Sequence, residues 1–399
     1  MSSQPGHRAD DPLDVLAGPA LLAAVAVGAF IEVSVPHHSY GWLVSVLALA
    51  AVGAGGAAAA LGAAAAAPPA PGVMRGAEAE HPRIPVAPTY RYPTAPPTQA
   101  PKSPPVILER PTDPNIPRFG DGARAQRYPW LIPERTVQNG IAADEATVGA
   151  FAIRAASVVG PGHRCQHPAE PRQDSYRIGR TRDNTYAIVA VADGVSSGTL
   201  SDAGATTASS QAVTLLRERI ERDGFLGLDV KELYQQIAES VGAQAAARSV
   251  ETSELATVLI TAVIEEPGPD ETANVWIGWL GDSSGWLLDP GGPRWTFQSG
   301  DAKDRSAAVA TNEVAGYLPD TPHLARSQFL TLPPGAALAL VTDGVGDAWA
   351  GQGGNVNQYF AKAWRSPVPA TRFTADLCFD APQCLDDRTA VVVWNGGRP

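Results

Sequence analysis

Short apolar runs of strand length recur from about Ala146 to the end of the chain, and turn residues separate them. Two longer stretches, at 205–223 and 230–249, space their apolar residues as amphipathic helices do, and they lie between an early pair of runs and a later series. The turns between several later runs are of hairpin length, which predicts antiparallel pairing. The pattern predicts a layered α+β domain and argues against a doubly wound parallel sheet. We expect Ser201 or Asp202 to cap the first helix.

The charge and cysteine content exclude several classes of protein. The 399 residues carry a formal net charge of −11. An acidic chain without a basic stripe argues against a nucleic-acid partner. Three cysteines do not make a disulfide framework, and no Cys/His cluster has the spacing of a zinc site.

Two uncharged apolar runs near the N-terminus predict a membrane hairpin within residues 15–67, with spans at about 15–35 and 41–65. The short loop between them has no Lys or Arg, whereas Arg8 precedes the pair and four basic residues follow it by position 102. The positive-inside rule then places residues 1–14 and everything after the hairpin in the cytoplasm. A buried helical hairpin and a signal peptide are the alternatives. The acidic leader disfavours the signal peptide.

Residues 68–145 contain about half of the 36 prolines in the chain. This composition predicts an extended, disordered linker between the hairpin and a domain at 146–399. A docking site for a proline-binding module is the alternative interpretation. The more apolar segment YPWLIPE, at 128–134, is a candidate to pack on the domain.

Aspartates recur at the ends of the apolar runs, namely Asp174, Asp193, Asp282, Asp343 and the adjacent Asp386 and Asp387. Any one of them is typical of a turn. Taken together, they predict carboxylates that converge on one rim, where their repulsion requires cations between them. Oxygen ligands favour Mg²⁺ or Mn²⁺. Glycine at Gly194 leaves its carbonyl free to face a metal.

The order of these motifs, RQDS, VAVADGVSSG, SELATVLITAVI, GWLGDSSGWLLD, LALVTDGVGD and DDRTAVVV, resembles the PP2C (PPM) family of metal-dependent serine/threonine protein phosphatases, as found in bacteria. The resemblance covers about residues 148–396. It implies a β-sandwich of two antiparallel sheets flanked by helices, with a dinuclear Mn²⁺ or Mg²⁺ site at one end. The implied partners are phosphoprotein substrates of Ser/Thr kinases.

The resemblance also implies roles for individual residues. Asp193 matches the aspartate that bridges two metals, and Gly194 matches the residue whose carbonyl binds the second metal. Asp343 and Asp386 match further ligands of the first metal. Asp174 matches an early aspartate that acts on the second metal, often through water. In bacterial members, the residue matching Asp282 binds a third metal.

The chain departs from the family pattern in three places. Gln173 stands where many members have a glutamate. Neither Arg164 nor Arg172 falls squarely on the phosphate-binding arginine, so both are candidates. The motif DGVSSG lacks the histidine proposed as a general acid in some relatives, and His163 is either a substitute or a solvated loop histidine. Gln173 and the altered glycine run motivate an alternative function, a pseudophosphatase that binds phosphoproteins as a scaffold.

Overall fold

The computed structural model describes residues 113–122, 128–165, 168–268, 271–301, 316–351 and 354–396. The predicted membrane hairpin and most of the predicted linker lie outside these ranges. Within them, no helix combines the length and the apolar character that a membrane crossing needs.

Eleven strands among the described residues form two sheets, and every neighbouring pair is antiparallel. The first sheet has the order β1 (Ile141–Val148), β2 (Phe151–Val158), β11 (Arg388–Asn395), β10 (Ala337–Val341), β7 (Ser284–Leu288) and β8 (Thr296–Ser299). The second has the order β3 (Ser175–Arg180), β4 (Tyr186–Gly194), β5 (Thr257–Glu265), β6 (Ala273–Leu280) and β9 (Arg326–Leu332). The predicted α+β class with two antiparallel sheets is confirmed.

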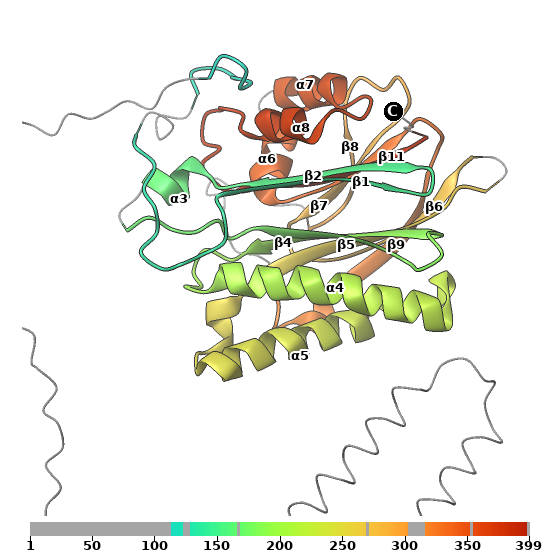
Figure 1. Cartoon of the computed structure of the whole chain (residues 1–399), viewed down its shortest axis with the longest axis horizontal. Coiled ribbons are helices and arrows are strands. Elements are labelled where there is room, and N and C mark those ends of the chain that lie inside the picture. The colour runs from blue at the N-terminus through green and yellow to red at the C-terminus, as the bar shows by residue number, and fades with distance from the viewer. Residues whose placement is uncertain are drawn as a thin grey trace, which may run out of the picture. The chain divides into compact units, whose positions relative to one another are not determined.

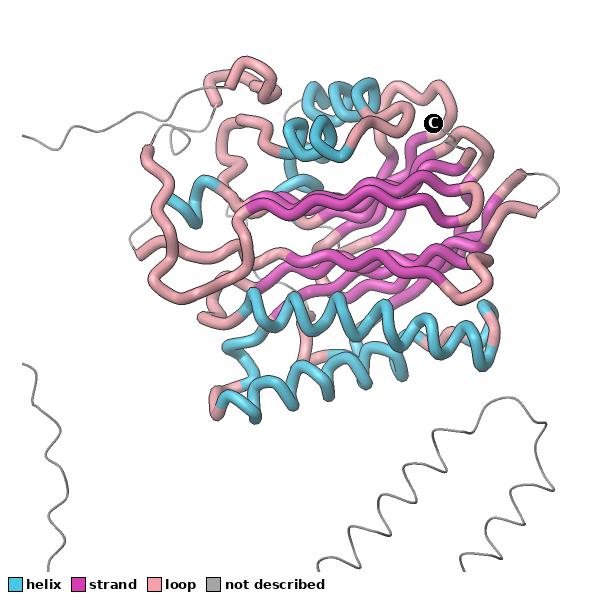
Figure 2. The backbone as a smooth tube through the Cα atoms, viewed as in Figure 1, coloured by secondary structure: helices cyan, strands magenta, loops and turns pink. Residues whose placement is uncertain are grey.

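The two sheets lie face to face, and helices cover both outer faces (Figures 1 and 2). Helices α4 (Ser201–Asp223) and α5 (Val230–Arg248) cover the second sheet, and α6 (Asp343–Ala350), α7 (Asn355–Ala363) and α8 (Ala370–Leu377) cover the first. One buried apolar cluster fills the space between the sheets, and one lies under each helical layer. A short helix, α3 (Pro161–Cys165), lies at the end of the sandwich where α4 begins.

Strand β2 is buried along its whole length, although its residues alternate as a half-buried strand would. Ala152 and Ala156 pack in the cluster under α6–α8, and Phe151 and Ile153 pack in the cluster between the sheets. Both faces of β2 are therefore buried, because α6–α8 cover the face that the small side chains occupy.

The domain begins earlier than expected. Strand β1 starts at Ile141, inside the region expected to be a disordered linker up to 145, and two pieces before it are bonded to the domain. The amide of Leu131 donates to the carbonyl of Arg164 (2.9 Å), and the amide of Phe119 donates to the carbonyl of Asp380 (2.7 Å). β1 is a mostly exposed edge strand. It therefore lacks the apolar pattern by which a strand is recognised.

The cap expected for α4 is also absent. Leu200 occupies the N-cap position and makes no side-chain capping bond. Ser201 is the first helical residue, and the Asp202 carboxylate instead binds the Arg135 guanidinium at 2.7 Å. Asp202 thereby ties the segment before β1 to the start of α4.

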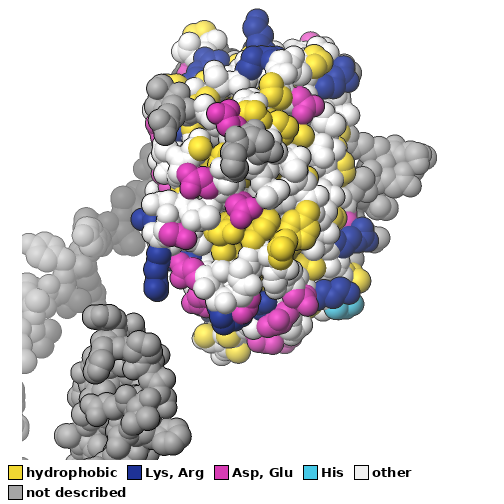
Figure 3. Space-filling view, turned by 90° about the vertical axis from the view of Figure 1, so that its right-hand side faces the viewer, with side chains coloured by type: hydrophobic (Ala, Val, Ile, Leu, Met, Phe, Trp, Pro, Cys, Tyr) yellow, Lys and Arg dark blue, Asp and Glu magenta, His cyan; other side chains and the backbone are white. Residues whose placement is uncertain are grey.

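The end of the domain away from α3 carries an apolar groove. Figure 3 views this end, and hydrophobic side chains gather on it among acidic and basic ones. The groove has a volume of about 670 Å³, and its walls include Phe225, Leu226 and Phe329. None of the predicted site residues lines it.

Candidate active site

The structure gathers the five predicted aspartates at one end of the sandwich. Asp193 lies near the end of β4, Asp174 directly before β3, Asp282 in the β6–β7 turn, Asp343 at the start of α6, and Asp386 just before β11. Burial raises the pKa of the Asp193 carboxyl well above its usual range, and Asp174, Asp343, Asp386 and Asp282 raise it further. All four carboxylates therefore lie near enough to Asp193 to act on it electrostatically.

Asp174 is held between the two sheets. Its side chain is buried, and its Oδ2 accepts hydrogen bonds from the hydroxyls of Thr342 (2.8 Å) and Thr389 (2.7 Å). Burial, followed by the charges of Asp387 and Asp386, raises its pKa, and the two hydroxyls act in the opposite sense. Thr389 lies in β11 and Thr342 directly follows β10, so two residues at the edge of the first sheet fix a carboxylate that lies directly before β3 of the second.

The donor set fits hard divalent cations. The strongest charge effects on Asp193 all come from other carboxylates, and such crowding is unfavourable unless protons or cations compensate it. Carboxylate oxygens are the ligands that Mg²⁺ and Mn²⁺ prefer. The part that each aspartate takes in binding a metal stays a prediction.

Glycine is required at position 194 by packing. A Cβ there would lie 2.9 Å from the Cβ of Ser201 and 3.0 Å from the Cβ of Gln173. The carbonyl of Asp193 accepts a hydrogen bond from the Thr257 hydroxyl at 2.7 Å, which fixes the peptide before Gly194. The assignment of the Gly194 carbonyl to a metal stays a prediction.

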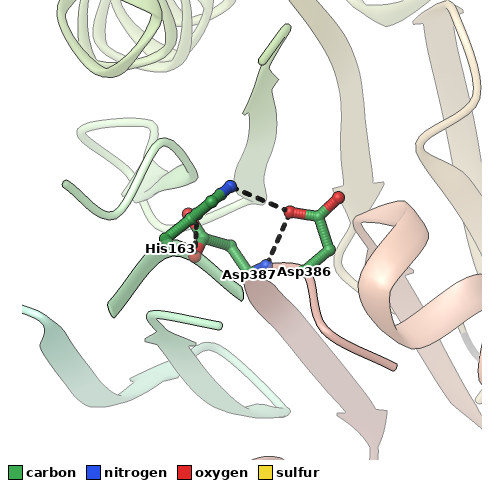
Figure 4. Close-up of side chains that lie close together, drawn as sticks. All are labelled: His163, Asp386 and Asp387. Atoms are coloured by element: carbon green, nitrogen blue, oxygen red, sulfur yellow. Dashed lines mark hydrogen bonds and ion pairs between the residues drawn. The ribbon is translucent and has the colours of Figure 1, made fainter. Parts of the chain in front are cut away.

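His163 is buried, so the expectation of a solvated loop histidine is wrong. Its side chain lies in α3, where Nδ1 is 2.8 Å from Asp387 Oδ1 and Nε2 is 3.6 Å from Asp386 Oδ1 (Figure 4). Ligand atoms of these three residues lie within 4.8 Å of one another. Burial alone would lower the pKa of His163, but Asp387, Asp386 and Glu170 together raise it to about 9.

Asp387 is predicted to lie among the converging carboxylates, but the sequence indicates no role of its own for it. It is 2% exposed, and it accepts hydrogen bonds from the amides of Gly160 (2.6 Å) and Gln173 (2.5 Å) as well as from His163. Burial would raise its pKa, but His163 and the two amides lower it below the usual value. The only available signal was the repeated aspartate in DDRT, which does not distinguish the two residues.

The two candidate phosphate-binding arginines are both buried, with Arg164 9% and Arg172 3% exposed, but their hydrogen bonds differ. Arg172 is buried, and each of its guanidinium nitrogens donates a hydrogen bond within the protein, to Asn139, Gln138, Ser157 and the carbonyl of Asp174. These four bonds occupy four of the five guanidinium N–H donors and indicate a structural role for Arg172. Arg164 lies in the wall of a groove of about 740 Å³ that residues 130–141 form, and it donates to the carbonyl of Leu131 (3.2 Å).

One family model matches the chain. A family model described as protein phosphatase 2C matches residues 160–377. The match spans Asp174, Asp193, Asp282 and Asp343, and it ends before Asp386. A search of curated proteins found no match.

Several solved structures resemble the chain at low identity. The serine/threonine phosphatase of S. agalactiae is 15% identical, with 61% of this chain and 99% of that chain covered and a TM-score of 0.44. The phosphatase PstP of Mycobacterium tuberculosis is 18% identical, with 61% and 97% covered and a TM-score of 0.40. PppA of Pseudomonas aeruginosa is 17% identical, with 62% and 98% covered and a TM-score of 0.41. The family model spans more than half of the sequence, and the chain belongs to the protein phosphatase 2C family.

Proposed function

We propose that this chain is a metal-dependent phosphatase that hydrolyses phosphoserine and phosphothreonine in proteins at the membrane surface. The observation that carries the proposal is the arrangement of four carboxylates around Asp193 in a domain of the protein phosphatase 2C family. Its substrates are the phosphoprotein products of serine/threonine kinases.

Five residues would hold two metal ions, Mn²⁺ or Mg²⁺. Asp193 would serve both ions, Asp343 and Asp386 would be further ligands of one, and the Gly194 carbonyl and Asp174 would be ligands of the other. When bound, such ions lower the pKa of a bound water molecule and neutralise the oxygens of a phosphoryl group. Asp282 is the candidate ligand of a third ion.

Hydrogen bonds from neighbouring residues orient the carboxylates of this site. The hydroxyls of Thr342 and Thr389 orient the Asp174 carboxylate, and the amides of Gly160 and Gln173 orient Asp387 beside Asp386. Arg164 remains the better of the two phosphate-binding candidates, because the hydrogen bonds of Arg172 are already made inside the protein.

The proposed membrane location rests on the apolar runs within residues 15–67 and on the basic residues on either side of them. Two spans at about 15–35 and 41–65 would leave the phosphatase domain in the cytoplasm, on a proline-rich linker. Tethering would restrict the substrates to phosphoproteins near the cell membrane.

The pseudophosphatase alternative has no observation in its favour. One motive for this alternative is Gln173. The backbone N–H of Gln173 donates to Asp387, and its side-chain amide donates to Glu170 (3.3 Å). Gln173 therefore has a structural part that does not require a charge. The four core aspartates, Asp174, Asp193, Asp343 and Asp386, are all present.

Phosphate release from a phosphothreonine peptide by the full-length chain in detergent tests the enzyme directly. We expect turnover with Mn²⁺ or Mg²⁺ and none with EDTA. We also expect Asp193→Asn to lose several kcal/mol of transition-state stabilisation, as a fall in kcat/KM of at least 10³-fold. Binding of the peptide without any release of phosphate, in a folded and metal-loaded protein, would refute the proposal in favour of a scaffold.

A further inference from the structure

The buried Asp387 carboxylate joins three segments that are far apart in the sequence. Its Oδ1 accepts from the amide of Gly160 and from His163 Nδ1, and its Oδ2 accepts from the amide of Gln173. Figure 4 shows the imidazole of His163 lying against both Asp386 and Asp387. One carboxylate therefore fixes α3, the segment before β3 and the segment before β11 relative to one another.

Two of these segments carry predicted metal ligands. Gln173 directly precedes Asp174. The hydrogen bond from the backbone N–H of Gln173 to Asp387 therefore fixes the backbone from which the Asp174 side chain projects. Asp386 directly precedes Asp387, and its Oδ1 accepts from the amide of Asp387 at 2.8 Å. The orientation of Asp387 thus bears on the spacing between Asp174 and Asp386.

The third segment presents His163 with little freedom. The amide of Gly162 donates to the carbonyl of Leu385 (2.8 Å), and a Cβ at Gly160 would collide with the backbone of 385–386. The carbonyl of His163 accepts from the amide of Glu170 at 2.8 Å. This close approach places Nδ1 of the buried imidazole directly on Asp387, as a supporting residue of a precise site requires.

We propose that His163 is a positioning residue, which holds Asp387 through Nδ1 and thereby sets the spacing of the metal-binding aspartates Asp174 and Asp386. The inference rests on the proposed metal site and adds a residue to it. Outer partners of this kind typically change metal affinity by about 10–100-fold when they are removed.

An alternative role for His163, as a proton donor or a metal ligand, would use its other ring nitrogen, Nε2. Nε2 lies 3.6 Å from Asp386 Oδ1 and 3.8 Å from Glu170 Oε2, and both distances exceed a hydrogen bond. A proton donor or a metal ligand would act through Nε2, whereas a positioning residue acts through Nδ1. The two parts are therefore assigned to different atoms and can be separated by substitution.

Asparagine and glutamine provide this separation. The amide nitrogen of Asn occupies about the place of Nδ1, and that of Gln reaches about the place of Nε2. We would titrate the full-length chain in detergent with Mn²⁺ in the absence of substrate, for the wild type, His163→Asn, His163→Gln and His163→Ala. We expect the Mn²⁺ Kd to rise by about 10–100-fold in the Gln and Ala variants and to stay within about threefold of the wild type in the Asn variant.

A matched control removes a partly buried hydrogen bond away from the site. The Tyr359 hydroxyl donates to Asp376 at 3.0 Å, and Tyr359→Phe should lower the melting temperature without changing the Mn²⁺ Kd. Unchanged Mn²⁺ affinity in all three His163 variants would overturn the proposed positioning role. A wild-type Mn²⁺ Kd in His163→Gln but not in His163→Asn would show that His163 acts through Nε2 instead of Nδ1. A wild type that binds Mn²⁺ but does not turn over refutes the proposed enzyme alone. A wild type that binds no Mn²⁺ refutes the inference as well.

Discussion

Asp386 and Asp387 are adjacent in the chain, and we predict that replacing each by alanine has a very different effect on the free energy of unfolding. Asp387 is 2% exposed and accepts three hydrogen bonds, at 2.5, 2.6 and 2.8 Å. About half of the Asp386 side chain is exposed. In protein without bound metal, Asp387 therefore stabilises the fold more than Asp386 does.

The size of the effect follows from these contacts. A hydrogen bond to a charged group contributes about 1.5–3 kcal/mol, and the values are not additive. Removal of one partner of a buried ion pair costs about 3–5 kcal/mol, because the other partner stays buried. We therefore expect Asp387→Ala to lower the free energy of unfolding by about 3–5 kcal/mol. For Asp386→Ala we expect a loss below about 1 kcal/mol, as is usual for an exposed carboxylate.

Urea unfolding of the full-length chain in EDTA, followed by tryptophan fluorescence, measures both changes. We expect the midpoint of Asp387→Ala to fall at an unchanged slope and that of Asp386→Ala to stay near the wild type. Equal midpoints for the two variants, or a loss below 1 kcal/mol for Asp387→Ala, would refute the reasoning.

Three further predictions concern the same end of the domain. Gly194→Ala should lower stability by about 1–3 kcal/mol, seen as a lower melting temperature, because its Cβ would overlap Ser201; an unchanged melting temperature would contradict the packing argument. Arg172→Lys should reduce stability by about 2 kcal/mol in urea unfolding, since lysine cannot make four divergent hydrogen bonds. Arg164→Lys gives up one hydrogen bond to the Leu131 carbonyl, so it should cost about 1 kcal/mol or less and raise the KM for a phosphopeptide. The opposite assignment of the two effects would make Arg172 the phosphate-binding residue. Removal of metal by EDTA should abolish phosphate release, and added Mn²⁺ should restore it; activity that persists after dialysis against EDTA would exclude metal dependence.

Patterns local in the sequence predicted much of the sandwich. Strands such as β4 and β11 are apolar runs bounded by turn residues, and they are central strands in the structure. The convergence of Asp193 with four other aspartates was also accessible, because each one stands at the end of such a run. Antiparallel strands joined by short turns bring alternate strand ends to the same edge, so position along the chain indicated position in space.

Features that depend on distant segments were not predictable in this way. The edge strand β1 has no apolar pattern because most of its side chains are exposed. His163 is buried by segments that lie far from it in the sequence, above all 385–387, and nothing in GPGHRCQ signals that closure. The hydrogen bonds of the Arg172 guanidinium likewise depend on Gln138 and Ser157, which lie 34 and 15 residues away in the sequence.

The central claim is that the carboxylates around Asp193 form a metal centre that performs phosphate release. The most direct test is equilibrium dialysis of the full-length chain against Mn²⁺, with bound metal per chain and phosphopeptide turnover measured in the same samples. The account predicts two bound Mn²⁺ ions and turnover in the wild type, and the loss of both in Asp193→Asn. Retention of both ions by Asp193→Asn, or turnover by wild-type protein that holds no metal, would contradict it.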